Sequence, residues 1–195
     1  MDKAIDNSNN SNNNTRNIVL AGAGAFLASA AIALIVTTRK RAKPLDVVSF
    51  VDLEKYAGEW FEIAKFPLSA EDNCTKSKAQ YVINKEGRLE VINSCHENGP
   101  HGKLRTSHAT GIPTDASNAR LKLKFNWPFI TGDYQILELG SDYEYAMVGT
   151  SNRKHLWILS RSPELSLDIV KSLLNKALAQ GFDTTKLIFT KQGKA

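Results

Sequence analysis

The block at residues 58–67 constrains the fold of this 195-residue chain more than any other segment. Its alternation predicts a strand with two apolar faces, one formed by Trp60, Ala64 and Phe66 and the other by Phe61 and Ile63. Apolar residues on both faces are typical of a strand that is covered on both sides. The Trp follows a Gly by two residues, which indicates a bulky plug beside a close backbone approach.

The chain after this block is a series of short strands separated by turn residues. Seven further segments alternate or run apolar, at residues 77–84, 88–93, 104–112, 119–125, 133–139, 143–150 and 154–160. Short links containing Gly, Asn, Asp and Ser are typical of adjacent antiparallel strands. Eight such strands can close on themselves and leave room for one small ligand. We therefore expect an all-β fold with one helix, an eight-stranded antiparallel up-and-down β-barrel.

One amphipathic helix is predicted after the last of these strands. Ser166 is a good N-cap and Gly181 a good C′ residue. Between them the apolar residues recur at helical spacing, at Leu167, Val170, Leu173, Leu174, Ala177 and Leu178. This stripe predicts a helix packed on the outside of the barrel. A final short strand is expected at residues 185–190.

The N-terminal region divides into three segments by composition. Residues 1–17 are rich in Asn and Ser, which predicts a disordered tail. Residues 18–38 contain no charge, and about 20 apolar residues span a bilayer as a helix, so we expect a single-pass transmembrane helix there. A basic linker at 39–49 leads to a barrel domain at 50–190. A cleaved signal peptide is the alternative, since Ala28-Ser29-Ala30 has the form of a cleavage site.

Small residues within residues 18–38 would allow two such helices to pack. Gly22, Gly24 and Ala28 are the candidates for this homodimer contact.

The basic excess of the chain is concentrated at its N-terminus. Residues 1–43 contain six Lys or Arg and two Asp, whereas the rest contains 19 basic and 18 acidic residues. The globular part is therefore nearly neutral, and the charge gives no argument for nucleic-acid binding. Basic residues beside an apolar segment are suited to phospholipid headgroups instead.

The two cysteines, Cys74 and Cys95, lie on either side of a predicted hairpin whose turn is at 85–87. Folding the chain at that turn brings them to nearly the same level, so a disulfide is plausible, with two unpaired thiols as the alternative. A disulfide would indicate an oxidising compartment. The count of Lys and Arg near the apolar segment favours a cytoplasmic barrel, but we expect the periplasmic or extracytoplasmic side. Two cysteines are too few for a zinc site, and we expect no metal.

Three blocks resemble the lipocalin family, most closely the bacterial lipocalins. They are Gly58-Glu59-Trp60, Thr131-Gly132-Asp133-Tyr134 and the segment from Leu156 to Arg161. The resemblance implies that Arg161 lies across Trp60 at the closed end of the barrel, with Gly58 as the third motif residue. Bacterial lipocalins usually carry a lipid-acylated Cys near the N-terminus, and residues 18–38 replace it here.

The same resemblance implies binding, and transport or storage, of fatty acids or lysophospholipids. The expected cavity residues are Phe66, Tyr81, Phe125, Tyr134 and Trp157, and no cofactor is expected. No constellation of catalytic residues is evident, so we expect a binding protein and not an enzyme. Two alternatives stay open: an enzyme that acts on a lipid inside such a barrel, and a haem carrier using His108 or His155.

Overall fold

The computed structural model describes residues 43–127 and 129–192. Contacts divide the chain between Lys40 and Arg41, and residues 41–195 form one compact unit. The predicted tail, the apolar segment 18–38 and its candidate dimer residues lie outside the described residues. Among the residues that the structure does describe, no helix is long and apolar enough to cross a membrane.

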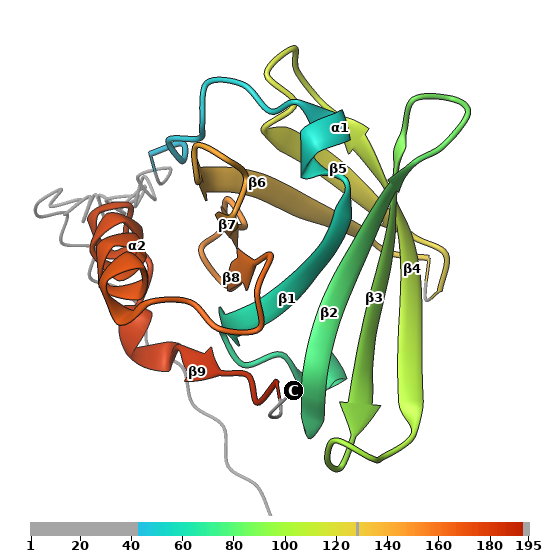
Figure 1. The fold of residues 1–195 in the computed structure, drawn as a ribbon. Helices are drawn as coiled ribbons and strands as arrows, with labels where there is room; N and C mark the ends of the chain where they lie inside the picture. The colour runs from blue at the N-terminus through green and yellow to red at the C-terminus, as the bar shows by residue number, and fades with distance from the viewer. Residues whose placement is uncertain (1–42, 128, 193–195) are drawn as a thin grey trace, which may run out of the picture. The chain divides into compact units, whose positions relative to one another are not determined.

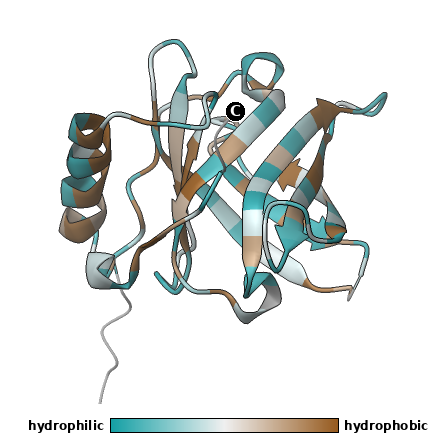
Figure 2. Ribbon diagram, turned by 60° about the horizontal axis from the view of Figure 1, so that its bottom comes forward, coloured by the Kyte–Doolittle hydropathy of each residue, from teal (hydrophilic) through white to brown (hydrophobic). Residues whose placement is uncertain are grey.

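Eight antiparallel strands form a closed barrel (Figure 1), as the sequence predicts. They are β1 (Gly58–Lys65), β2 (Cys74–Ile83), β3 (Leu89–Glu97), β4 (Leu104–Pro113), β5 (Arg120–Phe125), β6 (Thr131–Leu139), β7 (Tyr145–Gly149) and β8 (Leu156–Ser160). Each strand pairs with the next, and β1 pairs with both β8 and β2, which closes the ring. Closure leaves fewer unpaired backbone groups at sheet edges. Bands of alternating hydropathy run along several strands, as a period of two requires (Figure 2).

Two α-helices, two 3-10 turns and a ninth strand complete the described part of the unit. They are α1 (Leu53–Tyr56), the 3-10 turns η1 (Ser69–Glu71) and η2 (Thr184–Lys186), the long helix α2 (Leu167–Ala179) and β9 (Ile188–Phe189). The four-residue α1 was not predicted, because it is too short to show helical periodicity. Its N-cap Asp52 accepts hydrogen bonds from the backbone N–H groups of Glu54 and Lys55.

Helix α2 forms a separate layer beside the barrel (Figure 1). The side chain of Ser166 caps its N-terminus by accepting from Ile169 N, and Gly181 follows it with a φ of +84°. Both ends are therefore as predicted. Val170, Leu173 and Ala177 are buried, whereas Leu167 and Leu178 at the edges of the predicted stripe are exposed.

Two hydrophobic cores lie on opposite faces of the sheet. The first lies inside the barrel and contains Trp60, Tyr81, Leu121, Tyr134 and Leu159. The second lies between α2 and the outer face of β1, β6, β7 and β8, and contains Ile63, Leu137, Met147, Ile158 and Leu173. Strand β1 contributes to both, which explains why its sequence is apolar on both faces.

The C-terminal segment fills a seam in the barrel wall. The β1–β2 ladder ends at Phe61 and Lys78, and beyond this point β9 pairs with β1 through Ala64 and Lys65. A backbone hydrogen bond of 2.8 Å from Lys76 N to Lys191 O joins the same segment to β2. The sequence predicted a final strand but not this position.

Candidate functional site

The closed end of the barrel is built around Trp60 and Arg161. The ring of Trp60 is completely buried, and its Nε1 donates to the carbonyl of Tyr56 at 2.8 Å. The Arg161 guanidinium carbon lies 3.9 Å from the centre of that ring. Gly58 has a φ of +100°, and a Cβ there would lie 3.1 Å from Arg161 Nη1. This arrangement is the one that the resemblance implied, and it explains why a glycine is needed.

Arg161 also ties the segment before β1 to the rest of the barrel. Its side chain donates to the carbonyls of Lys55, Tyr56, Ala57, Glu59 and Tyr143, at 2.7–3.3 Å. A guanidinium suits this task because it offers several fixed donors and stays charged. Its contacts are all to backbone and to an aromatic ring, so its role is structural.

Two of the cavity candidates, Tyr81 and Tyr134, are joined by their hydroxyl groups. Tyr134 Oη lies 2.8 Å from Tyr81 Oη and 2.7 Å from the Oη of Tyr56, which the sequence did not single out. Burial raises the pKa of Tyr81 to about 12 and the pKa values of Tyr56 and Tyr134 well above their usual value. All three phenols are therefore neutral at neutral pH and link α1, β2 and β6.

The other candidates divide between the two faces of the sheet. Phe125 and Trp157 are partly buried against the core inside the barrel. Phe66 is not inside the barrel. It packs in the outer core, with its ring 6.2 Å from that of Phe182.

A β-bulge explains the error at Phe66. The register between β1 and β8 shifts between Glu62 and Ala64, so Ile63 and Ala64 both belong to the outer core. A bulge inserts one residue and reverses the alternation beyond it. The parity argument counted from Trp60 therefore fails after Glu62, and Lys65 takes the inner face instead of Phe66.

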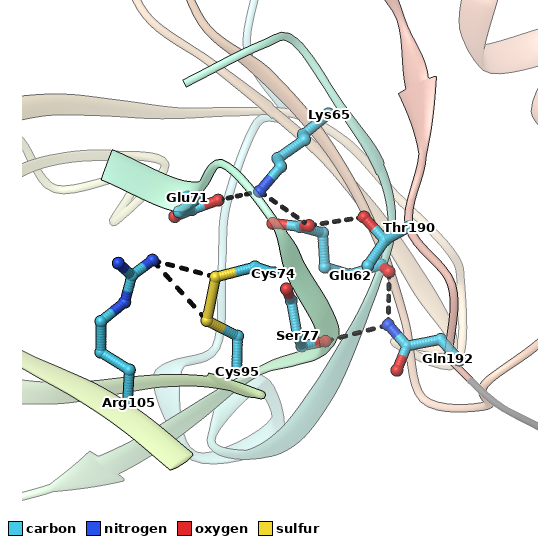
Figure 3. Close-up of polar contacts among 9 residues, drawn as sticks. All are labelled: Glu62, Lys65, Glu71, Cys74, Ser77, Cys95, Arg105, Thr190 and Gln192. Atoms are coloured by element: carbon cyan, nitrogen blue, oxygen red, sulfur yellow. Dashed lines mark hydrogen bonds and ion pairs between the residues drawn. A yellow bond between two sulfur atoms is a disulfide. The ribbon is translucent and has the colours of Figure 1, made fainter. Parts of the chain in front are cut away.

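The bulge creates a charged cluster that the sequence analysis missed (Figure 3). Lys65 and Glu62 are 4% and 6% exposed, and Lys65 Nζ lies 3.4 Å from Glu62 Oε1. The same Nζ forms an ion pair with Glu71 on the loop between β1 and β2. Thr190 Oγ1 donates to Glu62 Oε1 at 2.6 Å. Burial, and then repulsion from Glu71, raise the pKa of Glu62.

The cluster adjoins a pocket at the end of the barrel opposite Trp60, which we name the open end. The pocket has a volume of about 370 Å³ and is lined by Lys65, Leu68, Glu71, Ile188, Phe189 and eight further residues of β2, the neighbouring loops and the C-terminal segment. Gln192 closes the seam nearby, because its Nε2 donates to the carbonyls of Glu62 at 2.6 Å and Ser77 at 2.9 Å.

Cys74 and Cys95 form a disulfide that joins β2 to β3 near this pocket (Figure 3). Arg105 Nη2 donates to Cys74 Sγ at 2.9 Å, and its Nη1 pairs with Glu97 at 3.1 Å.

The candidate haem ligands lie in different settings. His108 is exposed, whereas the ring of His155 stacks on Trp157 at 5.7 Å. No group of three or more His, Cys, Asp or Glu side chains within residues 43–127 and 129–192 is arranged to hold a metal ion.

The fold and the site are those of a small β-barrel protein with a largely apolar interior. A family model described as a lipocalin-like domain matches residues 51–192. The chain belongs to the lipocalin family.

Relatives from plants, bacteria and mammals share this similarity. The chain is 36% identical to temperature-induced lipocalin-1 of Arabidopsis thaliana, over 77% of this chain and 84% of the relative. It is 35% identical to the outer membrane lipoprotein Blc of Escherichia coli K12, over 86% and 96%. Apolipoprotein D of Bos taurus is 31% identical, over 72% and 77%. None of these names carries an enzymatic activity.

Solved structures agree on the fold. Insecticyanin of the tobacco hornworm Manduca sexta aligns with a TM-score of 0.63 at 22% identity, over 78% of this chain and 87% of that chain. Lobster apocrustacyanin A1 aligns with a TM-score of 0.57 at 19% identity, over 80% and 94%. At this identity the likeness shows the fold alone.

Proposed function

We propose that this lipocalin binds single-chain lipids, either fatty acids or lysophospholipids, inside its barrel and carries or stores them at a membrane. The observation that carries the proposal is Trp157. Its ring is partly buried against the apolar interior, on a strand that begins at the open end. An apolar wall of this kind favours an acyl chain by about 0.8 kcal/mol for each buried CH₂ group.

The names of two relatives refer to lipid. One is named an outer membrane lipoprotein and another an apolipoprotein. The proposed activity is binding without catalysis, with Tyr81, Phe125, Tyr134 and Trp157 as the candidate contacts. Tyr81 and Tyr134 already bond to each other, so they would contact a ligand through their rings.

Isothermal titration of residues 41–195 with lauric acid and lysophosphatidylcholine tests this proposal. We expect saturable binding, and we expect Trp157→Ala to weaken it roughly tenfold because apolar contact area is lost. The matched control is Trp127→Ala, since Trp127 is 76% exposed on the loop after β5 and should leave the affinity unchanged. Absence of saturable binding for every fatty acid and lysophospholipid tried would refute the proposal.

We further propose that residues 18–38 anchor the chain in the membrane with the barrel outside the cytoplasm. The uncharged length of this segment supports the anchor. The Cys74–Cys95 disulfide supports an oxidising side, in keeping with a place in the cell envelope.

Alkaline carbonate extraction of cell membranes tests the anchor. The full chain should stay with the membrane pellet, and residues 41–195 alone should be released. Labelling of the two cysteines with a membrane-impermeant maleimide then shows on which side of the membrane the barrel lies. Labelling of intact cells only after reduction is expected, whereas thiols that react only after lysis and without reduction would place the barrel in the cytoplasm.

A further inference from the structure

Lys65 has an unusual setting for a residue at the end of a barrel strand. Its side chain is only 5% exposed and has two carboxylates within ion-pair distance, Glu62 and Glu71. A buried cation needs a partner, but one would be enough. The second carboxylate gives the cluster an excess of negative charge, and its repulsion adds to burial in raising the pKa of Glu62.

The two carboxylates differ in how firmly they are held. Glu62 lies within β1, and Thr190 donates to it across the seam. Glu71 lies at the end of the short turn η1, its side chain is 26% exposed, and Lys65 is the one ion-pair partner of its carboxylate among the described residues. Glu71 is therefore the carboxylate that can leave, and its departure would open Lys65 to the pocket.

Apolar residues flank Lys65 on both neighbouring strands. Lys65 pairs with Trp157 on β8 and with Ile188 on β9, and residues paired across antiparallel strands project from the same face. Lys65 therefore lies between two apolar side chains. Leu68 and Phe189 add apolar wall to the pocket, whose volume of about 370 Å³ falls in the range of small-molecule sites.

We propose that Lys65 receives the anionic headgroup of the lipid, a carboxylate or a phosphate, and that Glu71 occupies this position when no ligand is bound. Binding then exchanges one anion for another at Lys65 Nζ, while Glu62 stays in place. Because the exchange keeps the number of charges at Lys65 constant, it avoids leaving a buried cation unpaired. This assignment rests on the proposed lipid binding and adds the class of headgroup.

Matched ligands separate the headgroup from the chain. Residues 41–195 would be titrated with laurate, dodecyl phosphate, dodecanol and dodecylamine, which share the same alkyl chain. We expect laurate, dodecyl phosphate or both to bind more tightly than dodecanol, and dodecylamine to bind most weakly. The anion that binds more tightly shows whether the site prefers a carboxylate or a phosphate headgroup. Tighter binding of dodecylamine than of both anions would overturn the assignment.

Two variants test the residues. Lys65→Met should lower the affinity for the preferred anion about tenfold and leave the affinity for dodecanol unchanged, because only the charged contact is lost. Glu71→Gln should raise the anion affinity by roughly threefold to tenfold by removing the competing carboxylate. Its control is Asp72→Asn, which removes an exposed charge from the wall of the same pocket and should change little.

Glu71→Gln also covers the case in which Lys65→Met does not fold, since Glu71 is partly exposed. If dodecanol and the anions all bind but neither variant changes the ratio of their affinities, the role of Lys65 is refuted and lipid binding stands. If none of the four ligands binds, both proposals fail.

Discussion

Trp60→Ala should lower the free energy of unfolding by about 4 kcal/mol, the largest effect that we expect from a single substitution in this chain. The indole ring is completely buried, with the ring of Tyr56 at 5.0 Å and the Arg161 guanidinium on its face. Removing it leaves a cavity at the centre of the closed end and leaves the carbonyl of Tyr56 without the donor at Nε1. Both changes destabilise the folded state.

Urea unfolding of residues 41–195 measures this loss. Trp127→Ala is the matched control, because its exposed ring should change stability by no more than about 0.5 kcal/mol. A loss of less than about 1.5 kcal/mol for Trp60→Ala would mean that the end of the barrel collapses around the vacancy. The laurate affinity of the molecules that remain folded should stay close to that of the unchanged chain, because Trp60 lies at the opposite end from the pocket.

Local patterns were enough to predict most of the fold. A period of two in the strands, a period near 3.6 in α2 and a Ser and Gly at its ends all depend on neighbours in the sequence. The contact between Arg161 and Trp60 was predicted from the family's sequence motifs. The structure adds the reason for the glycine, because the Arg161 guanidinium occupies the space beside Gly58.

The pocket could not be predicted in this way, because it depends on contacts between distant residues. The bulge at Ile63 and Ala64 has no sequence signal in a strand that is apolar on both faces, and it decides that Lys65 and not Phe66 lies inside. The pairing of β9 with β1 depends on two residues and on Gln192, which bridges strands more than a hundred residues away. The hydroxyl triad of Tyr56, Tyr81 and Tyr134 is likewise formed only by folding.

Arg161→Ala should lower the free energy of unfolding by about 3 kcal/mol. The substitution removes the donors of carbonyl groups before β1, including those of Lys55 and Ala57, and also the cation over Trp60. Water can reach part of this surface and replace some of the hydrogen bonds, so the loss should be smaller than the sum of the contacts. Chemical unfolding with the same probe as for Trp60→Ala gives the value.

Two further variants separate the charge from the geometry of the guanidinium. Arg88→Ala is the control for losing an arginine, since its side chain is 52% exposed and forms a surface ion pair with Glu86; its cost should stay below about 1 kcal/mol. Arg161→Lys keeps the charge but loses the planar fork, so it should recover less than half of the stability lost in Arg161→Ala. Full recovery by lysine would show that a positive charge near Trp60 is sufficient and that the hydrogen bonds to the backbone contribute little. Recovery of less than half would instead assign most of the stabilisation to the fork, which is the result expected if Arg161 holds the segment before β1 against the barrel.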